Sequence, residues 1–196
     1  MSSKKELRTE LKKLRSLMDK QEKYVKDRLI AESFLSSSEY TDCSALLVYV
    51  SVGIEVDTSA IISDAFQKGK PVYCPRCVRG TNDMDFYLIR SLDDLVPGYY
   101  DIPEPKAECP KGSFDCKALC IVPALAYDGD GYRLGFGRGF YDKYLTSFPG
   151  RTVGLCYESC IRDSVFRESH DIAVDTIITE NRKLLINKRE DDRPDE

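Results

Sequence analysis

Short apolar runs alternate with segments of helical periodicity along most of this 196-residue chain, and this alternation limits the folds available to it. The apolar runs have the length of buried strands and cover residues 45–50, 71–74, 85–89, 119–122, 152–155 and 175–178. Helical periodicity covers residues 4 to about 36, 57 to about 68 and 140–147. Strands that alternate with helices are typical of α/β proteins, so we predict a single-domain layered α/β sandwich with a mostly parallel central sheet.

Capping residues and prolines refine the limits of these elements. Asp19 followed by Glu22 has the spacing of a capping box, which predicts that the N-terminal helical segment breaks into two helices near Asp19. Asp57 is expected to cap the next helix, which Gly69 would end. Four of the nine prolines fall between residues 97 and 110, which predicts an extended surface loop. We expect residues 1–186 to form the domain and the polar residues 187–196 to form a disordered tail.

Charge and histidine content exclude several classes of protein. The formal net charge is -4, so the chain lacks the basic excess of a dedicated nucleic-acid-binding protein. His170 is the only histidine, whereas common catalytic zinc sites and HExxH proteases need at least two. The first 28 residues are locally basic, with ten Lys and Arg against five Asp and Glu. This basic segment is either a solvated helix face or an attraction for a polyanion such as a nucleoside triphosphate.

The eight cysteines do not indicate a secreted protein, because a chain of this length can bury a core without disulfides. There is no apolar signal region and no apolar run near the roughly 20 residues of a membrane helix, so we expect a cytoplasmic protein without membrane contact. Cys74 and Cys77 form a CxxC spacing, which leaves open a redox pair or half of a zinc site.

Five of the twelve glycines lie within eleven residues, between Gly129 and Gly139, directly before a predicted helix. Glycine-rich backbone of this kind can approach a phosphate closely and bind it through N–H groups. Arg133 and Arg138 add charges that can bind phosphate oxygens, and Asp142 supplies an oxygen ligand suited to Mg²⁺. The segment contains neither the P-loop pattern nor the dinucleotide-binding pattern GxGxxG, which argues against a P-loop kinase and a Rossmann dehydrogenase.

The sequence resembles the 5-formyltetrahydrofolate cyclo-ligase family, also called methenyltetrahydrofolate synthetases. The resemblance is carried by residues 122–128 and 131–142, by the basic start at residues 4–8 and by the acidic turn at residues 55–58. Residues 97–105 and the closing segment 170–180 also resemble the family pattern, except that Asp101 stands where the family usually has glycine. Membership implies a compact α/β sandwich related to the ribose-5-phosphate isomerase and CoA-transferase type of sheet.

The resemblance implies an ATP- and Mg²⁺-dependent conversion of 5-formyltetrahydrofolate into 5,10-methenyltetrahydrofolate, with release of ADP and phosphate. Phosphorylation of the formyl oxygen would turn it into a leaving group, which needs positioning and charge stabilisation more than a nucleophilic side chain. Asp142 and Asp175 would hold Mg²⁺, and Arg133, Arg138 and Tyr141 would act in catalysis. We expect a monomer that acts on small molecules.

The same resemblance implies the residues that contact each substrate. ATP would contact Lys4, Lys5 and Arg8 on the N-terminal helix, and Arg133, Leu134, Gly135, Phe136, Gly137, Arg138, Gly139, Phe140 and Tyr141 in the glycine-rich segment. The folate substrate would contact Val50, Glu55, Phe136, Gly137, Arg138, Gly139 and Phe140.

Two alternatives come from other classes of protein. The first is a regulatory module of the same fold that binds nucleotide or folate without turnover. The second is a thiol or zinc protein that acts through Cys74 and Cys77. We expect His170 to be structural.

Overall fold

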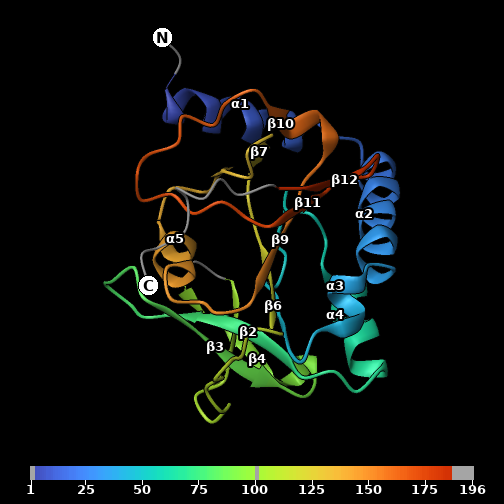
Figure 1. The fold of residues 1–196 in the computed structure, drawn as a ribbon, viewed down its shortest axis with the longest axis vertical. Helices are drawn as coiled ribbons and strands as arrows, with labels where there is room; N and C mark the ends of the chain where they lie inside the picture. The colour runs from blue at the N-terminus through green and yellow to red at the C-terminus, as the bar shows by residue number, and fades with distance from the viewer. Residues whose placement is uncertain (1–2, 100–101, 187–196) are drawn as a thin grey trace.

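The computed structural model describes residues 3–99 and 102–186, and its largest feature is a seven-stranded sheet. The inner strands are parallel, and the edge strands β12 and β3 are antiparallel to their neighbours. The predicted α/β architecture with a mostly parallel sheet is therefore confirmed (Figure 1). From edge to edge the strands are β12 (Lys183–Leu185), β11 (Thr176–Ile178), β9 (Arg151–Leu155), β6 (Leu119–Val122), β1 (Leu46–Leu47), β2 (Val72–Cys77) and β3 (Met84–Ile89).

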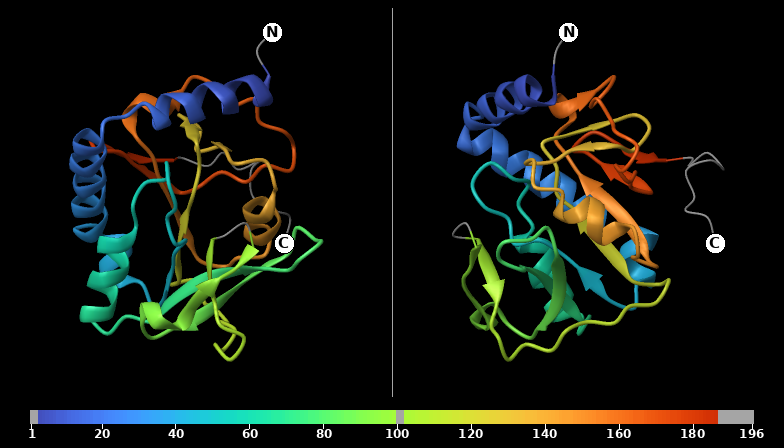
Figure 2. Two further views of the ribbon diagram at one scale, coloured as in Figure 1. Left: turned by 180° about the vertical axis from the view of Figure 1, so that it is seen from behind. Right: turned by 90° about the vertical axis from the view of Figure 1, so that its left-hand side faces the viewer.

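Helices cover the sheet along one side and across one end. Three of them follow one another down the same side, namely α2 (Lys20–Leu35), α3 (Ser38–Asp42) and α4 (Ser59–Gln67), while α5 (Phe140–Leu145) lies apart from them (Figure 1). The first helix, α1 (Lys4–Ser16), crosses the end of the sheet at which β6 and β9 end (Figure 2). Arg15 holds α1 in this position, because its guanidinium contacts Ala124, Leu125 and Cys156 just beyond those strands. In the described part of the chain, no helix is long and apolar enough to cross a membrane.

The break between α1 and α2 occurs at Asp19, as predicted. The Asp19 carboxylate accepts hydrogen bonds from the N–H groups of Gln21 and Glu22, which satisfies two donors at the start of α2. The reciprocal capping box forms instead at the start of α1, between Ser3 and Glu6. The predicted cap of α4 is displaced by one residue, because Thr58 occupies the cap position while Asp57 accepts the N–H of Ser59.

Strand β1 is shorter than the apolar run at residues 45–50. Thr58 explains the early end of the strand, because its hydroxyl donates to the carbonyl of Tyr49 and accepts from the N–H of Ser51. The side chain thus satisfies backbone groups that a longer strand would have paired in the sheet. As a result, the chain turns away after β1 and forms the loop that carries Glu55.

The glycine-rich segment is two structures rather than one loop. Its first half is a hairpin of β7 (Ala126–Asp128) and β8 (Arg133–Leu134), beside which β10 (Ile161–Arg162) pairs. The Asp128 carboxylate forms the turn by accepting the N–H groups of Asp130 and Tyr132. Only residues 135–139 remain as a loop before α5. The periodicity of the sequence did not predict the hairpin, because its strands are only three and two residues long.

The predicted extended loop at residues 97–110 contains regular structure. Strands β4 (Leu95–Pro97) and β5 (Pro103–Pro105) pair antiparallel, after a short 3₁₀ turn at Leu92–Asp94. Another 3₁₀ turn covers Glu158–Cys160. Proline has no N–H group and cannot donate a hydrogen bond within a central strand. Prolines therefore occur at the ends of short edge strands such as these. Asp101 and the predicted disordered tail at residues 187–196 lie outside the described residues.

Candidate active site

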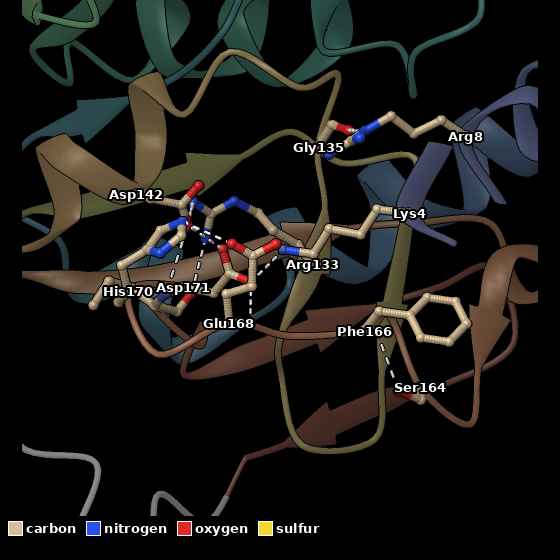
Figure 3. Close-up of polar contacts among 11 residues, drawn as sticks. Lys4, Arg8, Arg133, Gly135, Asp142, Ser164, Phe166, Glu168, His170 and Asp171 are labelled. Carbon is tan, nitrogen blue, oxygen red and sulfur yellow. Dashed lines mark hydrogen bonds and ion pairs between the residues drawn. The ribbon is translucent and has the colours of Figure 1, made fainter. Parts of the chain in front are cut away.

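The N-terminal helix lies against the loop at residues 135–139. Arg8 Nε donates a hydrogen bond to the carbonyl of Gly135 at 3.0 Å (Figure 3). A Cβ atom on Gly137 would lie 3.5 Å from the Arg8 guanidinium, and Lys12 Nζ lies 5.8 Å from the centre of the Phe136 ring. The structure therefore brings together two parts of the predicted ATP site that are more than a hundred residues apart in the sequence.

Lys4 is held by two carboxylates from the segment after β10. Its ammonium lies 2.9 Å from Asp171 Oδ2 and 2.9 Å from Glu168 Oε1. Burial lowers the pKa of Lys4, but the bonds to Asp171 and Glu168 outweigh that effect and raise it, so the side chain stays cationic. His170 Nε2 lies 3.7 Å from Asp171 Oδ1 at the surface of the same cluster (Figure 3). For Lys4 to bind ATP, phosphate oxygens would have to replace these carboxylates. Lys5, in contrast, is exposed.

Arg133 forms an ion pair with Asp142. Its Nη2 donates to Asp142 Oδ1 at 2.5 Å, and its Nη1 donates to the carbonyl of Ile172 at 2.8 Å (Figure 3). The Arg133 side chain is almost wholly buried, so both terminal nitrogens serve the protein itself rather than an open phosphate site. Asp142 Oδ2 has no hydrogen bond to any described residue. Arg138, the other predicted catalytic arginine, lies on the exposed loop.

Two glycines allow the loop at residues 135–139 to turn into α5. Gly137 has φ +101° and Gly139, which caps α5, has φ +72°, both in the region that side chains disfavour. Gly135 has no such requirement, and a Cβ atom there would meet open space. The backbone conformation that we expected for a phosphate-binding loop therefore depends on Gly137 and Gly139.

Gly137→Ala is expected to lower the free energy of unfolding by about 1 kcal/mol or more, because alanine is strained at a positive φ. Gly135→Ala is the matched control, and its stability should stay close to that of the parent protein. Thermal denaturation of the two variants compares these effects, and equal loss of stability would show that backbone conformation at Gly137 is not the cause.

The hydroxyl of Tyr141 is buried and has no hydrogen-bond partner in the described structure. Burial raises its pKa well above the ordinary value, and the nearby Cys120, Glu55 and Tyr49 raise it further, so the group is a neutral donor. An unsatisfied buried hydroxyl is costly, by about 1–3 kcal/mol, and is therefore uncommon without a functional reason. The Tyr141 hydroxyl is therefore a candidate hydrogen-bond donor to a ligand.

Glu55 lies on the loop after β1, and its charge acts on Tyr141. Its Oε2 accepts the N–H of Val52 at 2.8 Å, and burial raises the pKa of its carboxyl group. The half-buried Val50 packs against the core at the start of that loop. The charge of Glu55 helps to raise the pKa of Tyr141, although the sequence assigned these two residues to different substrates.

Asp175, the second predicted metal ligand, is engaged by a neighbouring strand. Its Oδ2 accepts hydrogen bonds from the N–H and the hydroxyl of Thr152, at 2.7 and 2.8 Å. The described residues include no group of three or more His, Cys, Asp or Glu side chains that could hold a metal ion. Any Mg²⁺ at Asp142 would therefore depend on oxygen atoms of a substrate for most of its ligands.

The CxxC pair lies within strand β2. Side chains three residues apart in a strand point to opposite faces, which separates Cys74 from Cys77. Burial raises the pKa of each thiol to about 12, so neither has the character of a reactive thiolate. These observations favour the cyclo-ligase interpretation over a thiol or zinc protein.

Sequence reasoning missed the buried arginine at the end of α1. The apolar series Leu7 and Leu11 continues four residues later at Arg15, which is buried, whereas Leu14 is partly exposed. The four-residue spacing was visible in the sequence, but a charged residue is not expected on a buried face. Glu168 and Asp171 were also missed as partners of Lys4, and nothing in their spacing indicates that contact.

Comparisons with known proteins identify the family of this chain. The family model described as the 5-formyltetrahydrofolate cyclo-ligase family matches residues 1–180. A 5-formyltetrahydrofolate cyclo-ligase from Mus musculus is 28% identical, with 92% of this chain and 95% of the relative covered. The enzyme of that name from Haemophilus influenzae is 26% identical, with 88% of this chain and 95% of the relative covered.

Two solved structures share the fold. The 5,10-methenyltetrahydrofolate synthetase of Aquifex aeolicus superposes with a TM-score of 0.82 at 27% identity, over 95% of this chain and 94% of that one. The synthetase of Mycoplasma pneumoniae superposes with a TM-score of 0.72 at 21% identity, over 91% of this chain and 99% of that one, which supports the fold alone. With its family model matched over residues 1–180, the chain belongs to the 5-formyltetrahydrofolate cyclo-ligase family.

Proposed function

We propose that this protein converts 5-formyltetrahydrofolate into 5,10-methenyltetrahydrofolate at the expense of ATP, with release of ADP and phosphate. The relatives that cover nearly the whole chain carry the name of this ligase activity. The observation in the structure that supports it best is the buried, unpartnered Tyr141 hydroxyl on the helix that follows the glycine-rich loop, where the charge of Glu55 also acts on it. We infer that the loop binds phosphate, that the Glu55 carboxylate binds the heterocycle of the substrate, and that the Tyr141 hydroxyl donates to one of the two ligands.

The chemistry needs an activated formyl group. The nitrogen lone pair of a formamide is delocalised, so its oxygen is a poor leaving group until it receives the γ-phosphoryl group of ATP. The folate N10 can then attack the formyl carbon, lose its proton and close the ring, and phosphate leaves with the former formyl oxygen. We assign the buried Tyr141 hydroxyl to hydrogen bonding near the formyl group and Glu55 to the pterin N–H groups, which a carboxylate accepts well.

The nucleotide would lie between α1 and the loop at residues 135–139. Arg8 already contacts that loop, and Lys4 is a cation whose carboxylate partners phosphate can replace. The exposed Arg138 would bind phosphate oxygens directly, and Lys5 would add to the positive potential. Arg133 acts in this arrangement as a positioning residue, because its bonds hold Asp142 and Ile172.

Asp142 fits a role in Mg²⁺ binding. Its Oδ2 is available, carboxylate oxygen is a preferred ligand of Mg²⁺, and substrate phosphates commonly complete such a site. The ion would neutralise charge on the phosphoryl groups during transfer. Asp175 stays a predicted second ligand, although its Oδ2 is used by Thr152.

We also propose that the protein acts as a monomer in the cytoplasm. All eight cysteines are free, which suits a reducing compartment, and the net charge of -4 does not favour nucleic acid as a partner. Analytical ultracentrifugation of the purified protein would show a single species of 22.3 kDa.

The activity is tested by mixing the protein with 5-formyltetrahydrofolate and MgATP and following the near-ultraviolet band of the methenyl product. We expect product only when both substrates are present, with one ADP formed per product. A regulatory module of the same fold would bind the ligands but form no product, and that outcome would overturn the proposal.

Tyr141→Phe separates a functional hydroxyl from a structural one. Removing an unsatisfied buried hydroxyl should keep or raise the free energy of unfolding, by up to about 1 kcal/mol. Turnover should nevertheless fall by about 100-fold if the hydroxyl contacts the reacting groups. Tyr144→Phe on the same helix is the control and should keep full activity. A Tyr141→Phe variant with unchanged kcat and KM would remove the hydroxyl from the mechanism.

A further inference from the structure

The segment that carries Glu55 is held by side chains from other parts of the fold. Residues 51–58 lie between β1 and α4 and are called the Glu55 loop below. Carbonyl groups on both sides of Glu55 accept hydrogen bonds, that of Ile54 from Arg15 Nη1 at 3.3 Å and that of Val56 from the Tyr49 hydroxyl at 3.0 Å. The backbone of the loop is therefore fixed around the residue that we assign to the pterin.

A buried carboxylate on α2 holds the same loop. Asp27 is 8% exposed, and its Oδ1 accepts the N–H of Asp57 at 3.2 Å and the hydroxyl of Tyr157 at 2.7 Å. The other oxygen, Oδ2, lies 2.7 Å from Lys23 Nζ on the same helix. One carboxylate thus connects α2, the Glu55 loop and the residue that follows the end of β9.

Tyr157 contacts both the carboxylate and the loop. Its side chain is fully buried, and its hydroxyl oxygen lies 3.4 Å from the carbonyl of Glu55 in addition to its bond with Asp27. Burial and the bond to Asp27 raise the pKa of Tyr157, so the hydroxyl keeps its proton and donates it to the carboxylate. The Arg15 guanidinium lies 5.1 Å from the centre of the Tyr157 ring. Tyr157 therefore packs between the Arg15 and Asp27 contacts of the loop.

A buried carboxylate adds little to stability on its own, because the cost of its desolvation offsets the bonds that it forms. The two bonds of Asp27 Oδ1 nevertheless need an acceptor at this position. We propose that Asp27 and Tyr157 are positioning residues that fix the Glu55 loop in the conformation in which Glu55 accepts the pterin N–H groups. This role rests on the proposed function, because it is Glu55 that would contact the substrate.

Loss of these contacts should affect one substrate only. A loop without its anchors samples several conformations, and the folate substrate binds more weakly in proportion to the fraction of time that the loop spends in the competent one. Among the described residues, the side-chain hydrogen bonds of Asp27 and Tyr157 join them to each other, to Lys23 and to the Glu55 loop, not to the loop at residues 135–139. ATP binding should therefore be unchanged.

The first experiment tests the anchor without any need for activity. Hydrogen exchange at the Asp57 amide is followed by NMR in the free protein, in Asp27→Leu and in Asp27→Asn. Leucine has a similar volume but no acceptor, so exchange should be about tenfold faster, whereas the asparagine oxygen can still accept both bonds and should keep exchange close to that of the parent. Unchanged exchange in Asp27→Leu, or equally fast exchange in both variants, would overturn the proposal.

The second experiment tests the positioning role by kinetics. KM for 5-formyltetrahydrofolate should rise about tenfold in Asp27→Leu and in Tyr157→Phe, with kcat and KM for ATP close to those of the parent, and Asp27→Asn should restore it. Tyr40→Phe is the control, because it removes a similar buried bond, from the Tyr40 hydroxyl to Asp64 Oδ1 at 2.6 Å, outside the Glu55 loop. Its KM values should not change.

Three outcomes of the kinetics would show that Asp27 and Tyr157 have no positioning role. They are an unchanged KM for the folate in both folded variants, a joint change in the KM values of both substrates, and a folded Asp27→Asn variant that behaves like Asp27→Leu. Lack of turnover in the parent protein would instead refute the proposed function, and hydrogen exchange would then decide whether Asp27 holds the loop.

Discussion

Asp142→Asn is expected to lower kcat/KM for MgATP by about 100-fold while the protein stays folded. The amide oxygen can still accept the hydrogen bond from Arg133, so the buried arginine keeps a partner. What is lost is the negative charge that Oδ2 would offer to Mg²⁺. The measurement is initial rate as a function of Mg²⁺ at fixed ATP, and the variant should need far more Mg²⁺ than the parent.

Asp130→Asn is the matched control, because this carboxylate is exposed in the hairpin turn of the same glycine-rich segment. It should leave the Mg²⁺ dependence unchanged. A folded Asp142→Asn variant with the parent's Mg²⁺ dependence would remove Asp142 from the metal site. Asp142→Ala is a less suitable probe, since it would leave Arg133 buried without its ion-pair partner.

Glu55→Gln should lower kcat/KM for 5-formyltetrahydrofolate by about 100-fold, with KM for ATP unchanged. An amide replaces two acceptor oxygens with one acceptor and one donor, so it opposes pterin N–H groups where the carboxylate accepts them. Steady-state kinetics with each substrate varied in turn measure the effect. Glu108→Gln, at an exposed position, is the control.

The pH dependence gives this prediction a second readout. Burial raises the pKa of Glu55, so its carboxylate is protonated at a higher pH than an ordinary glutamate as the solution is acidified. In the parent protein, kcat/KM for the folate should therefore fall on the acid side at a pH above the ordinary value of about 4.3. The Gln variant should lack this decline, and a decline of the same size in both proteins would assign it to another group.

The alternation of apolar runs and helices predicted six of the seven strands of the sheet, because strands such as β6 are buried on both faces and read as continuous apolar segments, whereas the edge strand β12 was not predicted. The elements that the sequence did not predict correctly are short or end early. The hairpin of β7 and β8 is too short for periodicity, and β1 ends early because Thr58, eleven residues downstream of Leu47, satisfies its backbone.

The site could be predicted as a set of residue types but not as a geometry. Sequence reasoning placed Arg133 on a phosphate, whereas the folded chain uses its terminal nitrogens to hold Asp142 and Ile172. Such a bond joins segments that are distant in the sequence, and no spacing rule reports it. The buried Arg15 was missed for a related reason: a charge on a core face is stabilised only by carbonyls and thiols that folding brings to it.

The central claim is that ATP activates the formyl oxygen of the folate substrate at this site. It is tested most directly with 5-formyltetrahydrofolate that carries a heavy oxygen isotope in its formyl group, incubated with the protein and MgATP. The account predicts that the methenyl product and inorganic phosphate form in equal amounts and that the phosphate contains the heavy isotope. Unlabelled phosphate, or methenyl product formed without ATP, would contradict the account.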